Sequence, residues 1–152
     1  MNVSKILKKK GNTCQSTTPD TLLVDAVRVM MQNRIGSLVV MEGGKLVSII
    51  TERDVLHAVD TYGADIGQVR VKDLMSPQLV TCTTRDSVDK IMDMMMHNVT
   101  KRRIRHLPVV ENGELRGLVS IGDVVDVLLT ETRFENQLLK NYIKNWPDTE
   151  KA

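Results

Sequence analysis

The chain has 152 residues, of which 41% are hydrophobic and 3% aromatic, and its 21 Lys and Arg against 19 Asp and Glu residues give a net charge of +2. This composition is typical of a globular protein with a well-formed core and excludes a disordered chain. A net charge this small does not by itself predict binding to nucleic acid or to a membrane surface. No run of about 18 apolar residues is present, so we expect no transmembrane helix.

The basic N-terminal stretch Met1–Lys10 is followed by Gly11–Thr13. A secretory signal has an apolar segment at this place, so we expect the protein to act in the cytoplasm. The two cysteines, Cys14 and Cys82, form no C-x-x-C motif and have no histidine pair near them. We therefore expect free thiols, no disulfide and no metal site.

The chain contains an internal repeat. Residues 34–57 match residues 103–126 at a constant offset of 69, and Leu23–Val27 match Val88–Met92 at an offset of 65. The second copy therefore has four extra residues near 99–102, since 69 − 65 = 4. A repeat of this kind predicts two copies of one supersecondary unit. We place the copies at about residues 12–64 and 71–130, within a module of residues 1–130.

The first copy predicts a strand, a helix, a hairpin and a second helix. After a leading strand at Gln15–Thr17, a helix is indicated by apolar residues at i, i+3, i+4 and i+7, which are Leu23, Ala26, Val27 and Met30. Two apolar segments, Leu38–Met41 and Leu46–Ile50, flank the pair Gly43-Gly44 and predict a β-hairpin. We expect the second helix from about Glu52 to Val59.

The second copy repeats this order. We expect a strand at Val80–Cys82, a helix from Val88 to Met95, a hairpin of Leu107–Val110 and Leu115–Val119, and a helix from Gly122 to Leu129. Pro108 has no N–H for a ladder, so its strand should lie at or beside a sheet edge. One copy cannot bury both faces of its sheet. We therefore predict an α/β (α+β) fold of two pseudo-symmetric β-α-β-β-α repeats that pack through their sheets and form equivalent clefts.

Residues 131–152 predict a helical tail. Phe134, Leu138, Tyr142 and Trp146 recur every four residues and form one apolar stripe. We expect this stripe to pack on its own domain, with a dimer or partner contact as the alternative. The helix should fray at Trp146–Asp148, because Pro147 cannot continue it.

Both copies have the pattern [ST]-x-x-D where the last strand meets the last helix. The residues are Thr51 to Asp54 in the first copy and Ser120 to Asp123 in the second. One interpretation is a helix cap, in which the hydroxyl and the acid satisfy free backbone N–H groups. The other is a binding site, because a helix start suits a phosphate and a carboxylate accepts two hydrogen bonds from a ribose diol. The two interpretations are compatible.

A basic stretch, Lys101–His106, leads into the strand of the second hairpin. Arginine offers a planar fork for phosphate and histidine adds a further donor. A solvated loop or a nucleic-acid contact are the alternatives, although aromatic residues that would stack on bases are absent from the stretch. The matching residues of the first copy, Arg34–Ser37, are less basic, so the two clefts should differ in their affinity for phosphate.

The whole pattern resembles a tandem pair of cystathionine β-synthase (CBS) domains, also called a Bateman module. The resemblance rests on the segments Ile104–Val110 and Gly117–Val124 together with Ile49–Val55, covers roughly residues 3–130, and is closest to small stand-alone bacterial CBS-pair proteins. It implies a sensor that binds adenosine-containing ligands between the repeats. AMP, ADP and ATP are the usual ligands, with NADH and S-adenosylmethionine as variants. It also implies a homodimer in which two modules form a flat disc, and a downstream partner that the sequence does not identify.

The resemblance also assigns roles by position. Asp54 and Asp123 would hold ribose hydroxyls, Thr51 and Ser120 would contact ribose or phosphate, and Arg105 and His106 match positions that face phosphate. The full set of expected ligand-binding residues is Ser37, Thr51, Arg53, Asp54, Arg103, Arg105, His106, Pro108, Ser120, Ile121, Gly122 and Asp123. Ser48 replaces the glycine found at Gly117, and Gly36-Ser37 replaces the Arg-His pair. Both departures weaken the first cleft, so we expect the cleft at Asp123 to be the principal site.

No set of nucleophile, base and acid and no Walker-type loop is found, so we expect no enzyme activity. The leading hypothesis is a non-catalytic regulatory module that signals to a partner. The alternatives are a nucleic-acid-binding protein that uses Lys8–Lys10 and Arg102–Arg105, and a purely structural dimerisation domain.

Overall fold

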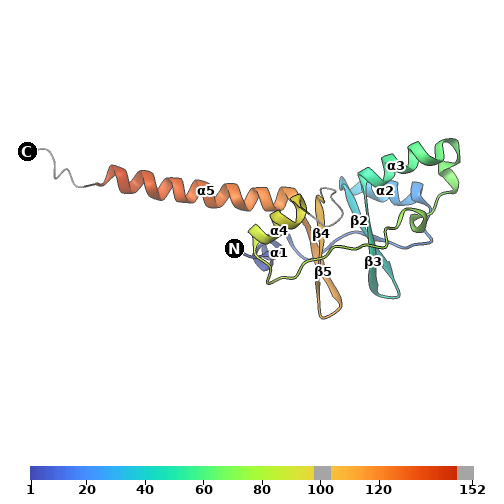
Figure 1. Ribbon diagram of the computed structural model, residues 1–152, viewed down its shortest axis with the longest axis horizontal. Coiled ribbons are helices and arrows are strands. Elements are labelled where there is room, and N and C mark those ends of the chain that lie inside the picture. The colour runs from blue at the N-terminus through green and yellow to red at the C-terminus, as the bar shows by residue number, and fades with distance from the viewer. Residues whose placement is uncertain (98–103, 147–152) are drawn as a thin grey trace, which may run out of the picture.

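Two β-hairpins lie side by side at the centre of the molecule, one from each half of the chain (Figure 1). The computed structural model describes residues 1–97 and 104–146. The first half contains α1 (Val3–Lys10), β1 (Ser16–Thr17), α2 (Leu23–Asn33), β2 (Ser37–Glu42), β3 (Lys45–Thr51) and α3 (Glu52–Tyr62). Two 3-10 helices follow, η1 (Gly63–Gln68) and η2 (Val71–Leu74), and the second half contains α4 (Val88–Met96), β4 (His106–Glu111), β5 (Glu114–Ser120) and α5 (Ile121–Lys144).

The hairpins confirm the repeat at the level of single residues. Strand β2 pairs with β3 so that Ser37 lies opposite Thr51, and β4 pairs with β5 so that His106 lies opposite Ser120. Each pair in the first hairpin thus maps onto the second at the offset of 69. Both hairpins also have a register shift at equivalent points, after Val40 and after Val109. The predicted α+β fold with two packed repeats is therefore confirmed.

The expected strand at Val80–Cys82 is wrong. In the first repeat β1 pairs in parallel with β2, whereas in the second repeat only Cys82 forms a bridge, to Val109. The Cys82 N–H donates to the Pro108 carbonyl at 3.0 Å, and the Val110 N–H donates to the Cys82 carbonyl at 2.8 Å. Pro108 faces this segment but has no N–H to offer it. The ladder therefore stops after one bridge, and β4 lies beside a sheet edge as expected.

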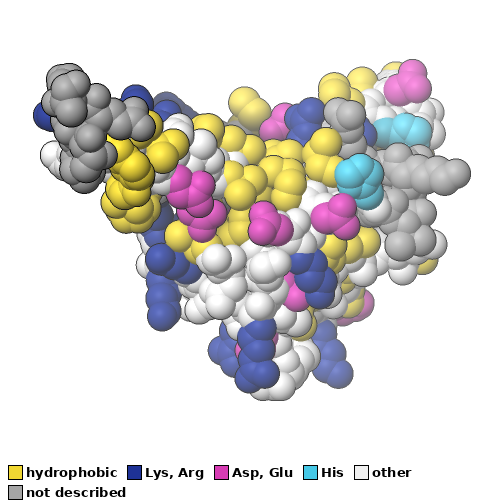
Figure 2. Space-filling view, turned by 60° about the vertical axis from the view of Figure 1, so that its left-hand side comes forward, with side chains coloured by type: hydrophobic (Ala, Val, Ile, Leu, Met, Phe, Trp, Pro, Cys, Tyr) yellow, Lys and Arg dark blue, Asp and Glu magenta, His cyan; other side chains and the backbone are white. Residues whose placement is uncertain are grey.

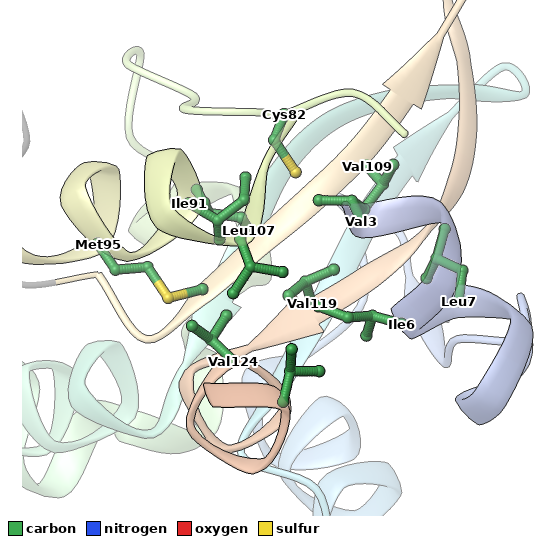
Figure 3. Close-up of a cluster of buried hydrophobic side chains, with 12 residues drawn as sticks. Val3, Ile6, Leu7, Cys82, Ile91, Met95, Leu107, Val109, Val119 and Val124 are labelled. Carbon is green, nitrogen blue, oxygen red and sulfur yellow. The ribbon is translucent and has the colours of Figure 1, made fainter. Parts of the chain in front are cut away.

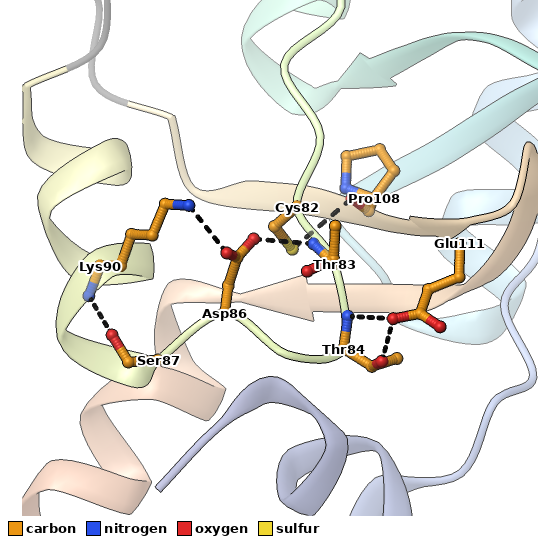
Figure 4. Close-up of polar contacts among 8 residues, drawn as sticks. All are labelled: Cys82, Thr83, Thr84, Asp86, Ser87, Lys90, Pro108 and Glu111. Carbon is orange, nitrogen blue, oxygen red and sulfur yellow. Dashed lines mark hydrogen bonds and ion pairs between the residues drawn. The ribbon is translucent and has the colours of Figure 1, made fainter.

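Side-chain hydrogen bonds replace the missing ladder at the entry to α4 (Figure 4). The Asp86 carboxylate accepts from the Thr83 N–H at 2.8 Å and from the Lys90 ammonium at 2.8 Å. Glu111 on β4 accepts from the N–H and the hydroxyl of Thr84. These contacts fix the chain between Cys82 and the start of α4 without a strand.

Each repeat has its own core, and α1 belongs to the core of the second repeat. Val3, Ile6 and Leu7 of α1 pack with side chains from α4, β4, β5 and the start of α5 (Figure 3). The backbone holds α1 there as well, because the Val3 N–H donates to the Asp86 carbonyl at 3.0 Å. The N-terminal helix therefore lies on the half of the molecule that is distant from it in sequence.

The expectation that the C-terminal stripe packs on its own domain is wrong. The last helix of the second repeat continues without a break as α5 to Lys144 and extends away from both repeats (Figure 1). Phe134, Leu138 and Tyr142 are between 53% and 64% exposed. The core buries Val124 and Val127 near the start of α5, and the rest of the helix extends beyond this core. The expected frayed end falls partly outside the described residues, which stop at Trp146.

No helix of the described ranges combines the length and the apolar character that crossing a bilayer would require.

Candidate functional site

The two [ST]-x-x-D segments form the same helix cap. In the first repeat the Asp54 Oδ2 accepts from the Thr51 N–H at 2.8 Å, and the Thr51 hydroxyl accepts from the Asp54 N–H at 3.4 Å. In the second repeat the corresponding distances, between Asp123 and Ser120, are 2.8 and 3.1 Å. Each helix therefore starts with a capping box that satisfies backbone N–H groups. The structural interpretation of the motif holds at both sites and leaves the binding interpretation open.

The first of these helix starts borders a cavity, and the second does not line it. A cavity of about 730 Å³ lies between the start of α3, the segment that follows η2, and the entry to β4. Its volume is within the range of small-molecule sites. The cavity is lined by Gly36, Ser48, Ile49, Thr51, Glu52, Arg53, Asp54, Ser76, Pro77, Gln78, Leu79, Val80, Ile104, Arg105 and His106.

The cavity combines a carboxylate from one repeat with a guanidinium from the other. Asp54 uses Oδ2 for the cap, and its Oδ1 accepts no hydrogen bond from the residues that the structure describes. Arg53 and Arg105 add two positive charges to the lining. Apolar side chains complete it, among them Ile49, Leu79 and Val80.

His106 lies half-buried at the cavity wall. Burial lowers the pKa of its imidazole, and the positive charge of Lys10 lowers it further. Its Nδ1 is buried and finds no hydrogen-bond partner among the described residues. A neutral imidazole has one N–H donor and one acceptor nitrogen, and the enclosed Nδ1 uses neither role with a described residue.

Asp123 is occupied by a lysine of α1. The Lys10 ammonium lies 2.6 Å from the Asp123 Oδ2 and 2.8 Å from the Leu118 carbonyl oxygen. Burial alone would raise the pKa of the Asp123 carboxyl, but the hydrogen bond and charge of Lys10, with the N–H of Ser120, hold this pKa below its usual value. The carboxylate is therefore ionised and already paired.

The structure brings together five of the expected ligand-binding residues. Thr51, Arg53, Asp54, Arg105 and His106 line the cavity.

The other expected residues lie elsewhere. Ser37 and Pro108 are buried in β2 and β4, and the segment Ser120–Asp123 lies at the second helix start, outside this cavity. Arg103 lies outside the described residues. The cavity is thus at the cleft that the sequence ranked second, and one of its two arginines, Arg105, comes from the opposite repeat together with His106.

Sequence reasoning missed the segment Ser76–Val80 and the two residues Gly36 and Glu52. A Cβ at position 36 would meet the Glu52 carboxylate, so the Glu52 side chain would have to move. The Glu52 N–H donates to the Gly36 carbonyl at 3.0 Å. A signal was available for Ser76–Val80, because it precedes the leading segment of the second copy at the junction between repeats.

The basic cluster Lys8–Lys10 is largely neutralised by α5. Besides the pair between Lys10 and Asp123, the Lys9 ammonium lies 3.0 Å from the Asp126 carboxylate. Paired lysines are poor contacts for a phosphate backbone, because each would first have to give up its carboxylate. The other half of the suggested nucleic-acid surface, at Arg102 and Arg103, lies outside the described residues.

The cysteines are free thiols in a protonated state. Cys82 is buried, and this burial raises the pKa of its thiol to about 12. Burial also raises the pKa of Cys14. Thiols that remain protonated are weak nucleophiles and weak metal ligands. Within residues 1–97 and 104–146, no three potential metal-ligating side chains gather in one place.

Comparisons with known proteins agree with this architecture. The CBS domain family matches residues 14–61 and 71–130. The chain is 37% identical over 151 residues to the CBS domain-containing protein CBSX3, mitochondrial, of Arabidopsis thaliana, covering 93% of this chain and 71% of that protein. The crystal structure of the CBS-domain protein ATU1752 from Agrobacterium tumefaciens is 35% identical with a TM-score of 0.78, covering 84% of this chain and 98% of that one. A structure of CBSX2 in complex with AMP has a TM-score of 0.68 at 23% identity, covering 86% of this chain and 98% of that one, and supports the fold alone. With the family matched in both repeats, the chain belongs to the CBS domain family as a CBS pair.

Proposed function

We propose that the protein is a non-catalytic regulatory module that binds an adenosine nucleotide, AMP, ADP or ATP, in the cavity beside Asp54. The observation that supports this best is the combination of an Asp54 carboxylate oxygen that no described residue contacts with Arg105 and His106 from the other repeat. A protein of the same fold, CBSX2, has been crystallised in complex with AMP.

The chemistry of the lining fits the three parts of such a ligand. The Asp54 Oδ1 would accept hydrogen bonds from the ribose hydroxyls, as a bidentate carboxylate does. Arg105 would pair with the phosphate, and His106 would donate to it. The apolar side chains of Ile49 and Leu79 would cover the adenine faces.

We place the ligand at Asp54 although the sequence favoured Asp123. The sequence predicts a weaker first cleft because of the departures at Ser48 and Gly36, but both residues line the cavity. The basic pair Arg105-His106 was assigned to the cleft of its own repeat, whereas it faces the cavity of the other one. The cleft at Asp54, although its local sequence departs more from the family pattern, therefore has the groups better suited to bind a nucleotide.

A ligand in this cavity would couple the two repeats. One wall comes from β3 and α3, and the opposite wall comes from the entry to β4. A nucleotide that bonds to both walls favours the relative placement of the two repeats in which the walls are at binding distance. Binding therefore shifts the population of molecules toward this placement. We infer that this shift is the signal that a downstream partner detects, in the cytoplasm as the sequence predicts.

We also propose that the protein is a homodimer. Leu56 and Val125 occupy equivalent positions of the two repeats, on α3 and α5, and both are exposed. Val59 and Leu129 extend the same surface, and Figure 2 shows hydrophobic side chains gathered on one face of the molecule. A surface with internal pseudo-symmetry suits a second copy of the chain, because a two-fold interface places the same patch on both sides.

A melting experiment with two matched variants tests the ligand proposal. AMP, ADP, ATP, NADH and S-adenosylmethionine are added in turn at 100 times the dissociation constant, where a ligand stabilises the folded state by about 2.7 kcal/mol. For a chain of this size the melting temperature should rise by about 5–10 °C. Asp54→Asn should abolish the rise, and Asp123→Asn, which alters the equivalent cap, should preserve it.

The outcomes separate the alternatives. If no adenosine compound raises the melting temperature of the unchanged protein, the structural dimerisation domain is the better account. Equal loss in the two Asn variants would show that the cap, and not a ribose contact, determines the response. Binding to nucleic acid that weakens steeply with salt would favour the nucleic-acid hypothesis.

A further inference from the structure

The two halves of the molecule hold equivalent helical segments against the loops that precede α4 and α2, and these segments differ in length. The Val3 N–H of α1 donates to the Asp86 carbonyl, and the Val71 N–H of η2 donates to the Thr21 carbonyl. One residue further, Ser4 donates to Thr84, and Lys72 donates to Pro19. Helix α1 and helix η2 therefore match each other at an offset of 68, since 71 − 3 and 72 − 4 are both 68.

A proline prevents the shorter segment from continuing as a helix to the length of α1. At this offset the position of Lys9 is taken by Pro77, and η2 stops at Leu74. A proline removes an N–H and disfavours helical backbone at the residue before it. The chain that follows η2 is therefore not helical and lines the cavity beside Asp54. No proline is present in α1, which continues to Lys10.

The longer helix places a cation on the second carboxylate. Lys10 corresponds to Gln78 of the cavity lining, but its ammonium lies 2.6 Å from the Asp123 Oδ2 and also donates to the Leu118 carbonyl. The Asp123 side chain is 23% exposed and that of Lys10 is 36% exposed. The pair is therefore partly shielded from water, and separating it costs more than separating a fully exposed pair.

Close packing of α1 against β5 supports the same arrangement. A Cβ at Gly117 would lie 2.8 Å from the Leu7 Cδ2 atom, so the glycine is needed for the approach of the helix. The first repeat has Ser48 at this position, and there it lines the cavity. In the second repeat α1 thus packs over β5, whereas in the first repeat the corresponding part of β3 borders the cavity.

From these differences we propose that Lys10 is a built-in occupant of the second cleft, so that the chain binds one nucleotide and not two. This inference rests on the proposed function. The Lys10 ammonium neutralises the Asp123 carboxylate and occupies its Oδ2 side, whereas no cation of the described residues pairs with Asp54. The pseudo-symmetric module thereby becomes a sensor with a single site per chain.

Calorimetric titration of the full chain with AMP tests this inference. The unchanged protein should bind one AMP per chain. Lys10→Gln, which installs the residue found at the matching position of the other half, should bind two, with the affinity of the second cleft increased at least about tenfold. The control is Lys9→Gln, which removes a neighbouring positive charge and its surface ion pair with Asp126. It should leave the stoichiometry at one. Asp123→Asn in the Lys10→Gln background should return the value to one.

The possible failures are distinguishable. Two AMP molecules per unchanged chain, or one in both the unchanged protein and Lys10→Gln, would overturn the role of Lys10 and leave the proposed function intact. If the unchanged protein binds none and Lys10→Gln binds one that Asp123→Asn abolishes, the closure by Lys10 stands and the site at Asp54 is refuted. No binding by any variant overturns both proposals.

Discussion

At the scale of single residues, Asp54 and Asp123 show how one motif acquires two roles. Both carboxylates use Oδ2 in a capping box. Asp123 is also paired with Lys10, a residue 113 positions away in sequence, whereas Asp54 borders a cavity. The motif was visible in the sequence, and its cap could be predicted from spacing alone. The choice between the two carboxylates depends on a distant lysine that no local pattern reveals.

Arg105 should determine the preference for phosphorylated ligands. Arg105→Ala removes a guanidinium from the cavity wall and leaves Asp54 and the apolar lining in place. AMP affinity should fall by about 1.5–3 kcal/mol, the usual contribution of a hydrogen bond to a charged group, while adenosine affinity should change little. Calorimetry with both ligands measures the difference. The control is Arg116→Ala, which removes an arginine that pairs with Glu114 on β5 and does not line the cavity. An equal loss for adenosine would assign Arg105 a structural role.

Acid should weaken the contribution of the pair between Lys10 and Asp123. The pKa of Asp123 lies below 3.8 in the folded protein, so the pair stabilises the fold above that value and loses its effect as pH falls through the lower folded pKa. Lys10→Ala should cost about 1 kcal/mol in free energy of unfolding at neutral pH. The cost should shrink as the pH falls below 3.8. Urea unfolding of the unchanged protein and of Lys10→Ala, at neutral pH and below pH 3.8, measures this cost. A cost that does not depend on pH would contradict the pairing.

At the scale of elements, the sequence predicted helices and hairpins from local periodicity and missed what depends on contacts between them. The helix starting at Leu23 and both hairpins lie where the apolar pattern placed them. The strand at Val80–Cys82 is absent because Pro108, on another strand, cannot complete the ladder. The length of α5 was not predictable either, because its stripe marks an apolar face without saying what covers it. The position of α1 on the second repeat follows from packing that no local signal encodes.

Gly117 should be essential for the docking of α1 on β5. Gly117→Ala places a methyl group 2.8 Å from the Leu7 side chain, which is buried and has little room to move. The free energy of unfolding should fall by about 1–3 kcal/mol, as in other overpacked cores. Gly67→Ala, where no atom lies within 4 Å of the added methyl group, is the control for urea unfolding. If Gly117→Ala leaves the free energy of unfolding unchanged, α1 can move away from β5 without loss of stability, and Gly117 is not essential for its docking.

At the scale of the whole molecule, a duplicated unit has become functionally asymmetric. The hairpins obey the pseudo-symmetry residue by residue, whereas the matching helices α1 and η2 differ in length. The sequence predicted the duplication and therefore two equivalent clefts. A proline after η2, a lysine at the end of α1 and a glycine in β5 make those clefts different. The lysine and the glycine act through contacts of α1 with the second repeat, and the proline acts on its own backbone.

The exposed apolar residues of α3 and α5 should hold two copies together. Leu56→Asp places a charge at the centre of the proposed interface and should convert a dimer into a monomer, because an unpaired buried charge is strongly unfavourable. Light scattering after size-exclusion chromatography measures the mass. Met31→Asp is the control, since Met31 is as exposed on α2, outside the surface formed by α3 and α5. A monomeric unchanged protein, or a dimeric Leu56→Asp variant, would contradict the assembly.

A crystal structure of the protein grown with AMP tests the central claim most directly. We predict electron density for one nucleotide in the cavity, with the ribose at the Asp54 carboxylate and the phosphate near Arg105, while Lys10 still contacts Asp123. Density beside Asp123 in place of Lys10, or solvent alone in the cavity beside Asp54, would contradict the account.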